Sequence, residues 1–217
     1  MTKSEKTRHS ILERAIDLAS LEGLEGLTIG RLADELKMSK SGLFAHFGSK
    51  EELQLAVVDA AQHRFVTEVL QPALRAAQRG YPRLVAICQA WLDYVKAGRV
   101  FPGGCFFAAA SFEFDGRPGP VRDRIAGMMD EWIAALQRAI LSAQAEGHLD
   151  TSVDPDQLAF ELNALFFGAN FSRYLRDDER AVELAARAIE ARLKALRLPG
   201  CPVVTTAAGS ETFTVST

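Results

Sequence analysis

The sequence contains little cysteine, and its three cysteines are poorly placed for cross-linking. Cys88, Cys105 and Cys201 are odd in number, lie far apart and form no CxxC pair. A disulfide framework or a structural zinc site needs paired or closely spaced cysteines, so neither is expected. We therefore predict three reduced thiols.

Histidine clusters and the common catalytic motifs are also missing. The four histidines are scattered along the chain at positions 9, 46, 63 and 148. We find no nucleophile elbow, no phosphate-binding glycine loop, no HExxH motif and no carboxylates grouped with histidine. The sequence therefore predicts no catalytic residues, no metal and no cofactor, and leaves a helical enzyme or interaction protein as a remote alternative.

Long apolar runs are absent as well. No stretch of eighteen apolar residues and no charged-then-apolar leader occurs, so neither a membrane span nor export is expected. The chain has 217 residues, 48% of them hydrophobic, a mean hydropathy near zero and a net charge of −3. These values predict a folded cytoplasmic protein with no membrane partner.

The stretch 27–53 carries the clearest pattern. Thr28 precedes apolar residues at helical spacing and is expected to cap a short helix, and Ser39 is placed to cap a second helix from Lys40. In this second helix Leu43 and Phe47 share one face. Two short helices joined by a tight turn are typical of a helix-turn-helix, whose second helix reads the DNA major groove. A plain helical corner is the alternative that periodicity leaves open.

The segment MSKSGLFAHFGSKEEL (38–53) closely resembles the recognition-helix signature of the TetR/AcrR family of bacterial transcriptional regulators. That signature has a Gly-Val-Ser turn, a Leu-Tyr-x-His-Phe helix and a Ser-Lys-Glu-x-Leu helix start, in this order. The resemblance implies a ligand-responsive DNA-binding regulator, a repressor released from a palindromic operator by a small effector. It also implies an all-α homodimer with a helix-turn-helix head on a helical body, about nine helices in total.

The resemblance assigns DNA contacts position by position. The expected contacts are Thr28, Arg31, Ser39, Lys40, Ser41, Gly42, Phe44, Ala45, His46 and Lys50. Lys40 is the best candidate for a base edge or a phosphate, and Lys50 for a phosphate at a helix start. Phe44 stands where the family commonly has tyrosine, which removes a phosphate-binding hydroxyl. For His46 a surface or packing role is equally open.

Helical spacing continues through the body. We expect helices at 5–22, from Lys50 to about 78 with a kink or break at Pro72, and at 84–95, 106–112, 121–145, 156–175 and 179–196. The predicted domains are a DNA-binding head (1–50), an effector-binding and dimerisation body (51–197) and a disordered tail (198–217).

Apolar stripes on the last two helices predict the dimer surface. The stripe residues are Leu158, Leu162, Leu165, Ala169, Leu184, Ala188 and Ala191. An ordinary core stripe has the same spacing, so periodicity alone does not separate the two interpretations.

Aromatic residues in the body predict a pocket for a small apolar or aromatic effector. The candidate pocket residues are Trp91, Tyr94, Cys105, Phe106, Phe112, Trp132, Phe167 and Phe171, with Glu113, Asp115 and Arg173 as possible anchors for a polar end. Because Cys105 follows two glycines at a helix start, a thiol-based sensor of electrophiles or oxidants is an alternative function, and a small buried residue is the plainer interpretation.

Overall fold

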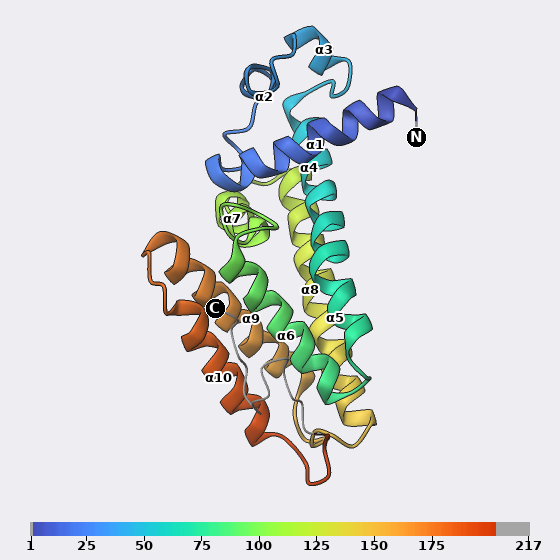
Figure 1. The fold of residues 1–217 in the computed structure, drawn as a ribbon, viewed down its shortest axis with the longest axis vertical. Helices are drawn as coiled ribbons and strands as arrows, with labels where there is room; N and C mark the ends of the chain where they lie inside the picture. Colours follow the sequence, from blue (N-terminus) through green and yellow to red (C-terminus); the bar gives the residue numbers. More distant parts are fainter. Residues whose placement is uncertain (1, 203–217) are drawn as a thin grey trace. The chain divides into compact units, whose positions relative to one another are not determined.

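The computed structural model describes residues 2–202, and their regular structure is helical. The helices are α1 (Lys3–Glu22), α2 (Ile29–Leu36), α3 (Lys40–Phe44), α4 (Lys50–Phe65), α5 (Gln71–Ala76), α6 (Tyr81–Ala97), α7 (Phe106–Phe114), α8 (Pro120–Ala145), α9 (Pro155–Leu175) and α10 (Ala181–Ala195) (Figure 1). The predicted all-α fold is confirmed. Among these residues no helix is long and apolar enough to cross a bilayer.

The helix that begins at Lys50 is interrupted where the sequence predicts. Between α4 and α5 the segment Val66–Leu70 is a π-helix, and Pro72 lies in the first turn of α5. Proline has no N–H to donate and its ring clashes with the preceding turn, so the regular hydrogen-bond ladder cannot continue through it. Counted as one interrupted helix, these segments bring the described part of the chain to the expected nine helices.

The chain forms two compact units, and neither is a continuous stretch of sequence. Unit 1 contains residues 1–65 and 98–129, and unit 2 contains residues 66–97 and those from 130 onward. The helix α4 starts at Lys50 and packs on α1, so it lies in the same unit as the helix-turn-helix. The functional division at residue 50 stays a prediction.

In unit 1 the head is built on capped helices and a shared apolar core. Thr2 caps α1 in a reciprocal capping box with Glu5, and Thr28 caps α2 through its hydroxyl. The core side chains Leu24, Leu27, Leu32, Leu43, Phe47 and Leu53 are at most 1% exposed. Because these residues come from the two loops as well as from the helices, the core fixes α2 and α3 against α4.

Unit 2 packs α6, α9 and α10 together, and α9 and α10 run side by side (Figure 1). The last described residues of this unit are also packed, since Cys201 is 6% exposed and Leu198 donates its N–H to the carbonyl of His148 at 3.0 Å. The tail expected to be disordered from residue 198 therefore starts with packed residues. The rest of that expectation, residues 203–217, lies outside the described residues.

Candidate nucleic-acid interface

The second helix of the motif, α3, presents one side to solvent. Ser39 adopts an extended conformation (φ −70°, ψ 144°), and its hydroxyl accepts from the Gly42 N–H at 3.1 Å. Leu43 is fully buried, whereas Ser39, Lys40, Ser41, Phe44 and Ala45 are exposed. The exposed side is thus the one that the sequence assigned to DNA.

The turn before α3 needs a left-handed residue. Lys37 ends α2 with φ 54° and ψ 37°, and Met38 donates its N–H to the carbonyl of Ala33 at 3.0 Å. A left-handed residue after a helix reverses the chain within a few residues and satisfies the free carbonyls. This turn sets the short spacing between α2 and α3.

The helix α3 is shorter than the pattern suggested, because it ends at Phe44. Phe47 lies beyond its end but is still buried, at 1% exposed, while Phe44 is 52% exposed. His46 is half-buried, with its ring centroid 6.3 Å from that of Phe47. The exposed ring at position 44 therefore presents an apolar surface where a phenol would offer a hydroxyl.

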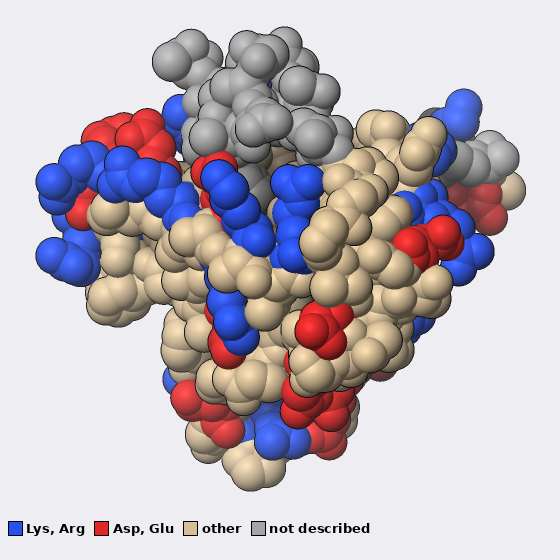
Figure 2. Space-filling model, turned by 90° about the horizontal axis from the view of Figure 1, so that it is seen from below, with Lys and Arg blue, Asp and Glu red and all other residues tan. Residues whose placement is uncertain are grey.

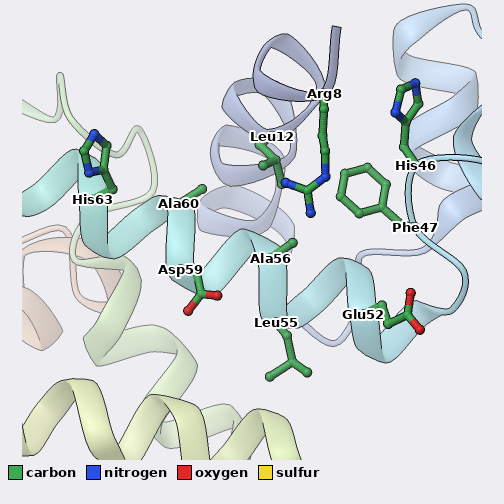
Figure 3. Close-up of a pocket in the computed structure, with 10 residues that line it drawn as sticks. All are labelled: Arg8, Leu12, His46, Phe47, Glu52, Leu55, Ala56, Asp59, Ala60 and His63. Carbon is green, nitrogen blue, oxygen red and sulfur yellow. The ribbon is translucent and has the colours of Figure 1, made fainter. Parts of the chain in front are cut away.

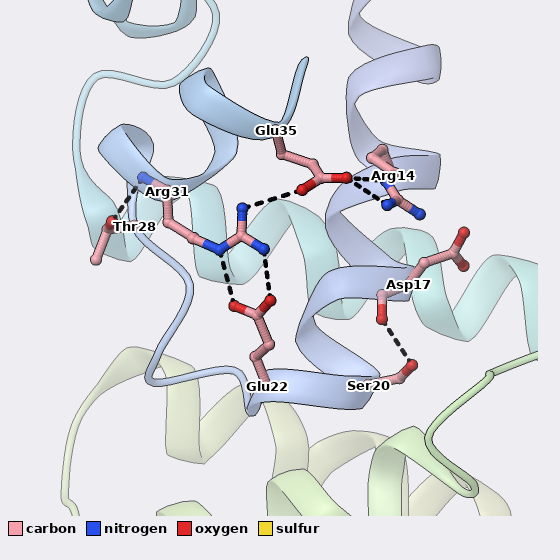
Figure 4. A network of polar contacts seen from close by, with 7 residues as sticks. All are labelled: Arg14, Asp17, Ser20, Glu22, Thr28, Arg31 and Glu35. Carbon is pink, nitrogen blue, oxygen red and sulfur yellow. Dashed lines mark hydrogen bonds and ion pairs between the residues drawn. The ribbon is translucent and has the colours of Figure 1, made fainter. Parts of the chain in front are cut away.

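Arg31 is engaged within the head instead of standing free. Its guanidinium donates to Glu22 at 2.6 and 3.0 Å and to Glu35 at 3.0 Å, and Arg14 binds the other oxygen of Glu35 (Figure 4). Hydrogen bonds from Arg31 hold the pKa of Glu22 below its usual value, and those from Arg14 and Arg31 do the same for Glu35. A DNA contact by Arg31 has to use the N–H groups that these carboxylates leave free, or to displace one of the carboxylates.

Lys50 is also paired. Its Nζ lies 2.7 Å from Oε1 of Glu25, and this hydrogen bond is the main cause of the lowered pKa of Glu25. The Thr28 hydroxyl, by comparison, accepts only the Arg31 N–H of its own helix, at 3.1 Å. Two of the expected DNA-binding cations are therefore bound to carboxylates that lie 9 and 25 residues away in the sequence.

Arg8, on α1, is a candidate contact that is not among the residues expected from the sequence. Its guanidinium carbon lies 4.9 Å from the centroid of the Phe47 ring, a cation–π contact that fixes the side chain beside the end of α3. Arg8 borders a groove of about 540 Å³ between α1 and α4 (Figure 3). The remaining lining residues are Leu12, His46, Phe47, Glu52, Leu55, Ala56, Asp59, Ala60 and His63. No periodic signal links positions 8 and 47, so sequence alone does not reveal this contact.

Charge of one sign does not dominate the face shown in Figure 2. Lysine and arginine alternate there with aspartate and glutamate, and wide uncharged areas separate them. This mixture agrees with the small net charge of −3. Because the net charge of the chain is small, attraction to DNA depends on where individual cations stand rather than on bulk charge.

The eight residues expected to line an effector pocket belong to both units. Cys105, Phe106 and Phe112 are in unit 1, and Trp91, Tyr94, Trp132, Phe167 and Phe171 are in unit 2. The structure places Phe112 and Phe171 on the surface, 61% and 47% exposed, so neither lines an enclosed cavity within its own unit. The groove of Figure 3 includes none of the eight.

An aromatic cluster in unit 2 brings together three of the predicted pocket residues around a fourth ring. Trp91 stacks on Phe166 with centroids 4.4 Å apart, and Trp132 lies 5.9 Å from Phe166. Tyr94 meets Trp91 edge-on at 5.7 Å, and the indole N–H of Trp132 donates to Asn163 at 3.1 Å. Phe166 was the member missing from the expected set.

Two of the three polar residues suggested as effector anchors have other partners. The Glu113 carboxylate accepts from the backbone N–H groups of Leu24 and Glu25 at 2.8 and 3.0 Å, and Arg173 pairs with Glu179. Glu113 therefore stabilises the loop between α1 and α2.

The predicted dimer stripe is in part a core stripe. Leu158, Leu162 and Ala169 are at most 3% exposed within the chain itself, so they cannot contact a second copy. These three are corrected to core residues. Leu165 and Ala188 are half-buried, whereas Leu184 is 47% exposed and Ala191 is exposed.

The opposite face of α9 is apolar and exposed. Phe160 is 68% exposed, Phe171 47% and Leu175 70%, and Ala164 and Gly168 between them are exposed as well. Their spacing of three or four residues places them along one side of the helix. The exposed apolar stripe of α9 thus begins two residues after the expected stripe and lies on the other side of the helix.

The three cysteines are free and buried. Cys105 caps α7, with its Sγ 3.4 Å from the Ala108 N–H, and is 4% exposed. Burial raises the pKa of Cys88 to about 12 and also raises the pKa of Cys201. A thiol sensor needs an accessible thiolate, so this geometry favours the small buried residue over the sensor.

Known proteins resemble the chain over most of its length. A model described as "Bacterial regulatory proteins, tetR family" matches residues 11–57, and one described as "Tetracyclin repressor-like, C-terminal domain" matches residues 80–189. The chain is 24% identical to the HTH-type transcriptional regulator TcmR of Streptomyces glaucescens over 208 residues, which cover 90% of this chain and 84% of that protein.

Solved structures show the same fold. A TetR transcriptional regulator from Chloroflexus aurantiacus superposes with a TM-score of 0.84 at 25% identity, covering 91% of this chain and all of that one. AibR, crystallised with isovaleryl coenzyme A and operator DNA, gives a TM-score of 0.65 at 24% identity over 87% of this chain and 97% of that one.

Proposed function

The chain belongs to the TetR family of bacterial regulatory proteins and is a DNA-binding transcriptional regulator, and we propose that it represses transcription from a palindromic operator until a small effector releases it. The observation that carries this proposal is the exposed side of α3. It consists of two serines (39 and 41), one lysine (40) and two apolar side chains (44 and 45), while Leu43 and Phe47 are buried in the core. No catalytic group, metal or cofactor is part of the proposal, and the cytoplasm is the proposed location.

Within the head, Lys40 is the proposed reader of a base edge or phosphate, and Ser39, Ser41 and Gly42 enter the groove with it. Phe44 and Ala45 offer apolar contact to thymine methyl groups. Thr28, Arg31, His46 and Lys50 are proposed to hold phosphates. Arg31 and Lys50 share their N–H groups between a carboxylate and a phosphate or exchange one for the other on binding, so the carboxylates reduce their contributions to affinity.

A homodimer is proposed, because two heads are needed to read a palindrome. The outward stripe of α9, from Phe160 to Leu175, supports a second copy as the occupant, and Leu184 of α10 is exposed as well. Exposed apolar patches of this extent are characteristic of protein interfaces. Half-sites about 34 to 36 Å apart, one DNA turn, would suit such a dimer.

The effector is proposed to be a small apolar or aromatic molecule that binds beside the aromatic cluster of unit 2. Trp132 and Phe167 are half-buried there, so part of each ring is open to a ligand. The crystallised complex of AibR with a coenzyme A thioester shows that a protein of this fold takes an organic ligand. The effector acts by binding one of two states more tightly than the other.

Operator binding is tested by fluorescence anisotropy with DNA from the region upstream of the chain's own gene. We expect saturable binding that competitor DNA of scrambled sequence does not displace. The double variant Ser39→Ala/Ser41→Ala should lower operator affinity, because it removes the cap of α3 and two hydroxyls on its exposed side. Ser152→Ala, in a loop of unit 2, should leave operator affinity unchanged. Equal binding to operator and scrambled DNA by the folded protein would contradict sequence-specific regulation.

Effector binding is tested through the two tryptophans, which both lie in the cluster of unit 2. A molecule that binds beside Trp132 changes the fluorescence of the wild type and of Trp91→Phe, but changes that of Trp132→Phe less. The same molecule must then lower operator affinity. A ligand that lowers operator affinity without changing either tryptophan signal would place the effector site elsewhere.

A further inference from the structure

Glu25 lies between two cations that approach the same oxygen. Lys50, the first residue of α4, places Nζ 2.7 Å from Oε1 of Glu25. Arg117, in the loop between α7 and α8, places Nη1 3.5 Å from that oxygen. The three side chains are 37%, 39% and 54% exposed for Glu25, Lys50 and Arg117, so water and DNA phosphates can reach them.

The Glu25 residue is held in place by groups other than these cations. Gln54, 4% exposed, donates its amide to the Leu24 carbonyl at 2.9 Å and to Oε2 of Glu25 at 3.2 Å. Glu113 accepts the backbone N–H groups of Leu24 and Glu25. Because backbone and side chain are both fixed, the Glu25 carboxylate cannot follow Lys50 when Lys50 turns away.

The close approach of Glu113 depends on Gly23. This residue ends α1 with φ 87°, a backbone conformation that residues other than glycine rarely adopt. A Cβ at this position would lie 2.7 Å from Oε1 of Glu113. Successive N–H groups after such a residue form a concave site for an anion. The carboxylate of α7 occupies this site and so fixes the loop that carries Glu25.

We propose that Arg117 is a positioning residue for DNA binding: when Lys50 leaves Glu25 for a DNA phosphate, Arg117 becomes the remaining partner of Glu25. Without Arg117 the exchange would leave a carboxylate with no cation beside it, close to the DNA. The proposal rests on the phosphate contact assigned to Lys50 above. It gives the loop after α7 an electrostatic link to that contact, although Arg117 does not touch the DNA itself.

The test is a double-mutant cycle on operator affinity in the full-length protein. Arg117→Gln should weaken binding about two- to fivefold more than the control Arg122→Gln, the range expected for an exposed pair. The control removes the same charge from α8, where Arg122 pairs with its neighbour Asp123 at 3.1 Å. With Glu25→Gln already present, Arg117→Gln should weaken binding no more than the control does.

Lys50→Gln separates the two proposals. If Lys50 holds a phosphate, this variant lowers the slope of log affinity against log salt by about 0.9 for each protomer, or about 1.8 for the proposed dimer. An unchanged slope overturns both the contact and the inference. A second outcome overturns only the role of Arg117. In this outcome Lys50→Gln lowers the slope, but Arg117→Gln and Arg122→Gln weaken binding equally, both in the wild type and in Glu25→Gln. Circular dichroism spectra confirm that each variant is folded.

Discussion

Unit 1 and unit 2 both pack aromatic rings between distant segments, and in unit 1 the rings of Phe65, Phe101, Phe106 and Phe107 do so. The units differ in the buried charged contacts that unit 1 adds. In unit 1, charged side chains reach far along the sequence: Arg64 joins α4 to α1 and to the Val100 carbonyl, and Glu113 joins α7 to the loop after α1. In unit 2, stacked rings join α6, α8 and α9 around Phe166. Polar partners can be exchanged for phosphates or water, whereas a packed ring has no comparable substitute. The contacts of unit 1 that a phosphate can replace are therefore its polar ones, not its ring cluster or that of unit 2.

The largest effect is expected at the centre of the aromatic cluster. Phe166 is fully buried, so Phe166→Ala removes a stacked ring and leaves a cavity, which should lower the free energy of unfolding by about 3–5 kcal/mol. Phe166→Leu fills most of the space and should cost far less. Urea unfolding followed by circular dichroism measures both. Equal, small losses for the two variants would mean that the ring packing contributes little.

The outward stripe of α9 provides the second test of unit 2. Phe160→Glu places a charge in the proposed dimer surface and should weaken dimerisation at least about 100-fold, because a desolvated, unpaired carboxylate is strongly unfavourable in an interface. Sedimentation equilibrium measures the change. The control is Glu183→Gln, which changes the charge of an exposed side chain on α10. A variant that stays dimeric at the same concentration would remove this stripe from the interface.

Within unit 1 the largest polar effect is expected at Arg64. This guanidinium is 9% exposed and donates to Asp17, to the carboxylate and carbonyl of Glu13, and to Val100 at 2.7–3.0 Å. Arg64→Met should lower stability by about 2 kcal/mol, below the full value for a buried pair because the two carboxylates can rehydrate.

The matched control for Arg64 is Arg14→Met, which breaks an exposed pair with Glu35 and should cost less than about 1 kcal/mol. Thermal unfolding by circular dichroism compares the two variants. If both lose the same stability, burial adds nothing to the Arg64 contacts.

The smallest effect concerns the pH dependence of the Glu25 pair. Lys50 lowers the pKa of Glu25 in the folded state, so the contribution of this pair is fully present above the unfolded pKa of about 4.3 and is lost as the pH falls toward the folded value. The stability difference between wild type and Glu25→Gln should therefore shrink below about pH 4.5, by a few tenths of a kcal/mol for so exposed a pair. A difference that stays constant from pH 7 to pH 3.5 would contradict the assigned cause.

The sequence predicted the helices because their signals are local. Thr28 and Ser39 cap α2 and α3 as expected, and Pro72 interrupts the helix from Lys50. The exposed side of α3 followed from the same spacing, since burying Leu43 turns Lys40 and Ala45 outward.

What the sequence could not predict depends on distant partners or on a choice between equivalent faces. Nothing local links Arg31 to Glu22 or Lys50 to Glu25, so both cations looked available for DNA. Both sides of α9 are apolar, and periodicity alone cannot tell which side faces the core. The side of Leu158 and Leu162 is buried in the chain, and the side of Phe160 is exposed.

The most direct test of the central claim, that the exposed side of α3 meets DNA, is the operator affinity of Ala45→Glu. Ala45 is exposed and outside the core, so the substitution should preserve folding while placing a negative charge against the phosphates and bases. Ala76→Glu makes the same change at an exposed position of α5 and serves as the control. The account predicts at least about a 100-fold loss of operator affinity for Ala45→Glu and wild-type affinity for Ala76→Glu. Wild-type affinity in a folded Ala45→Glu protein would contradict it.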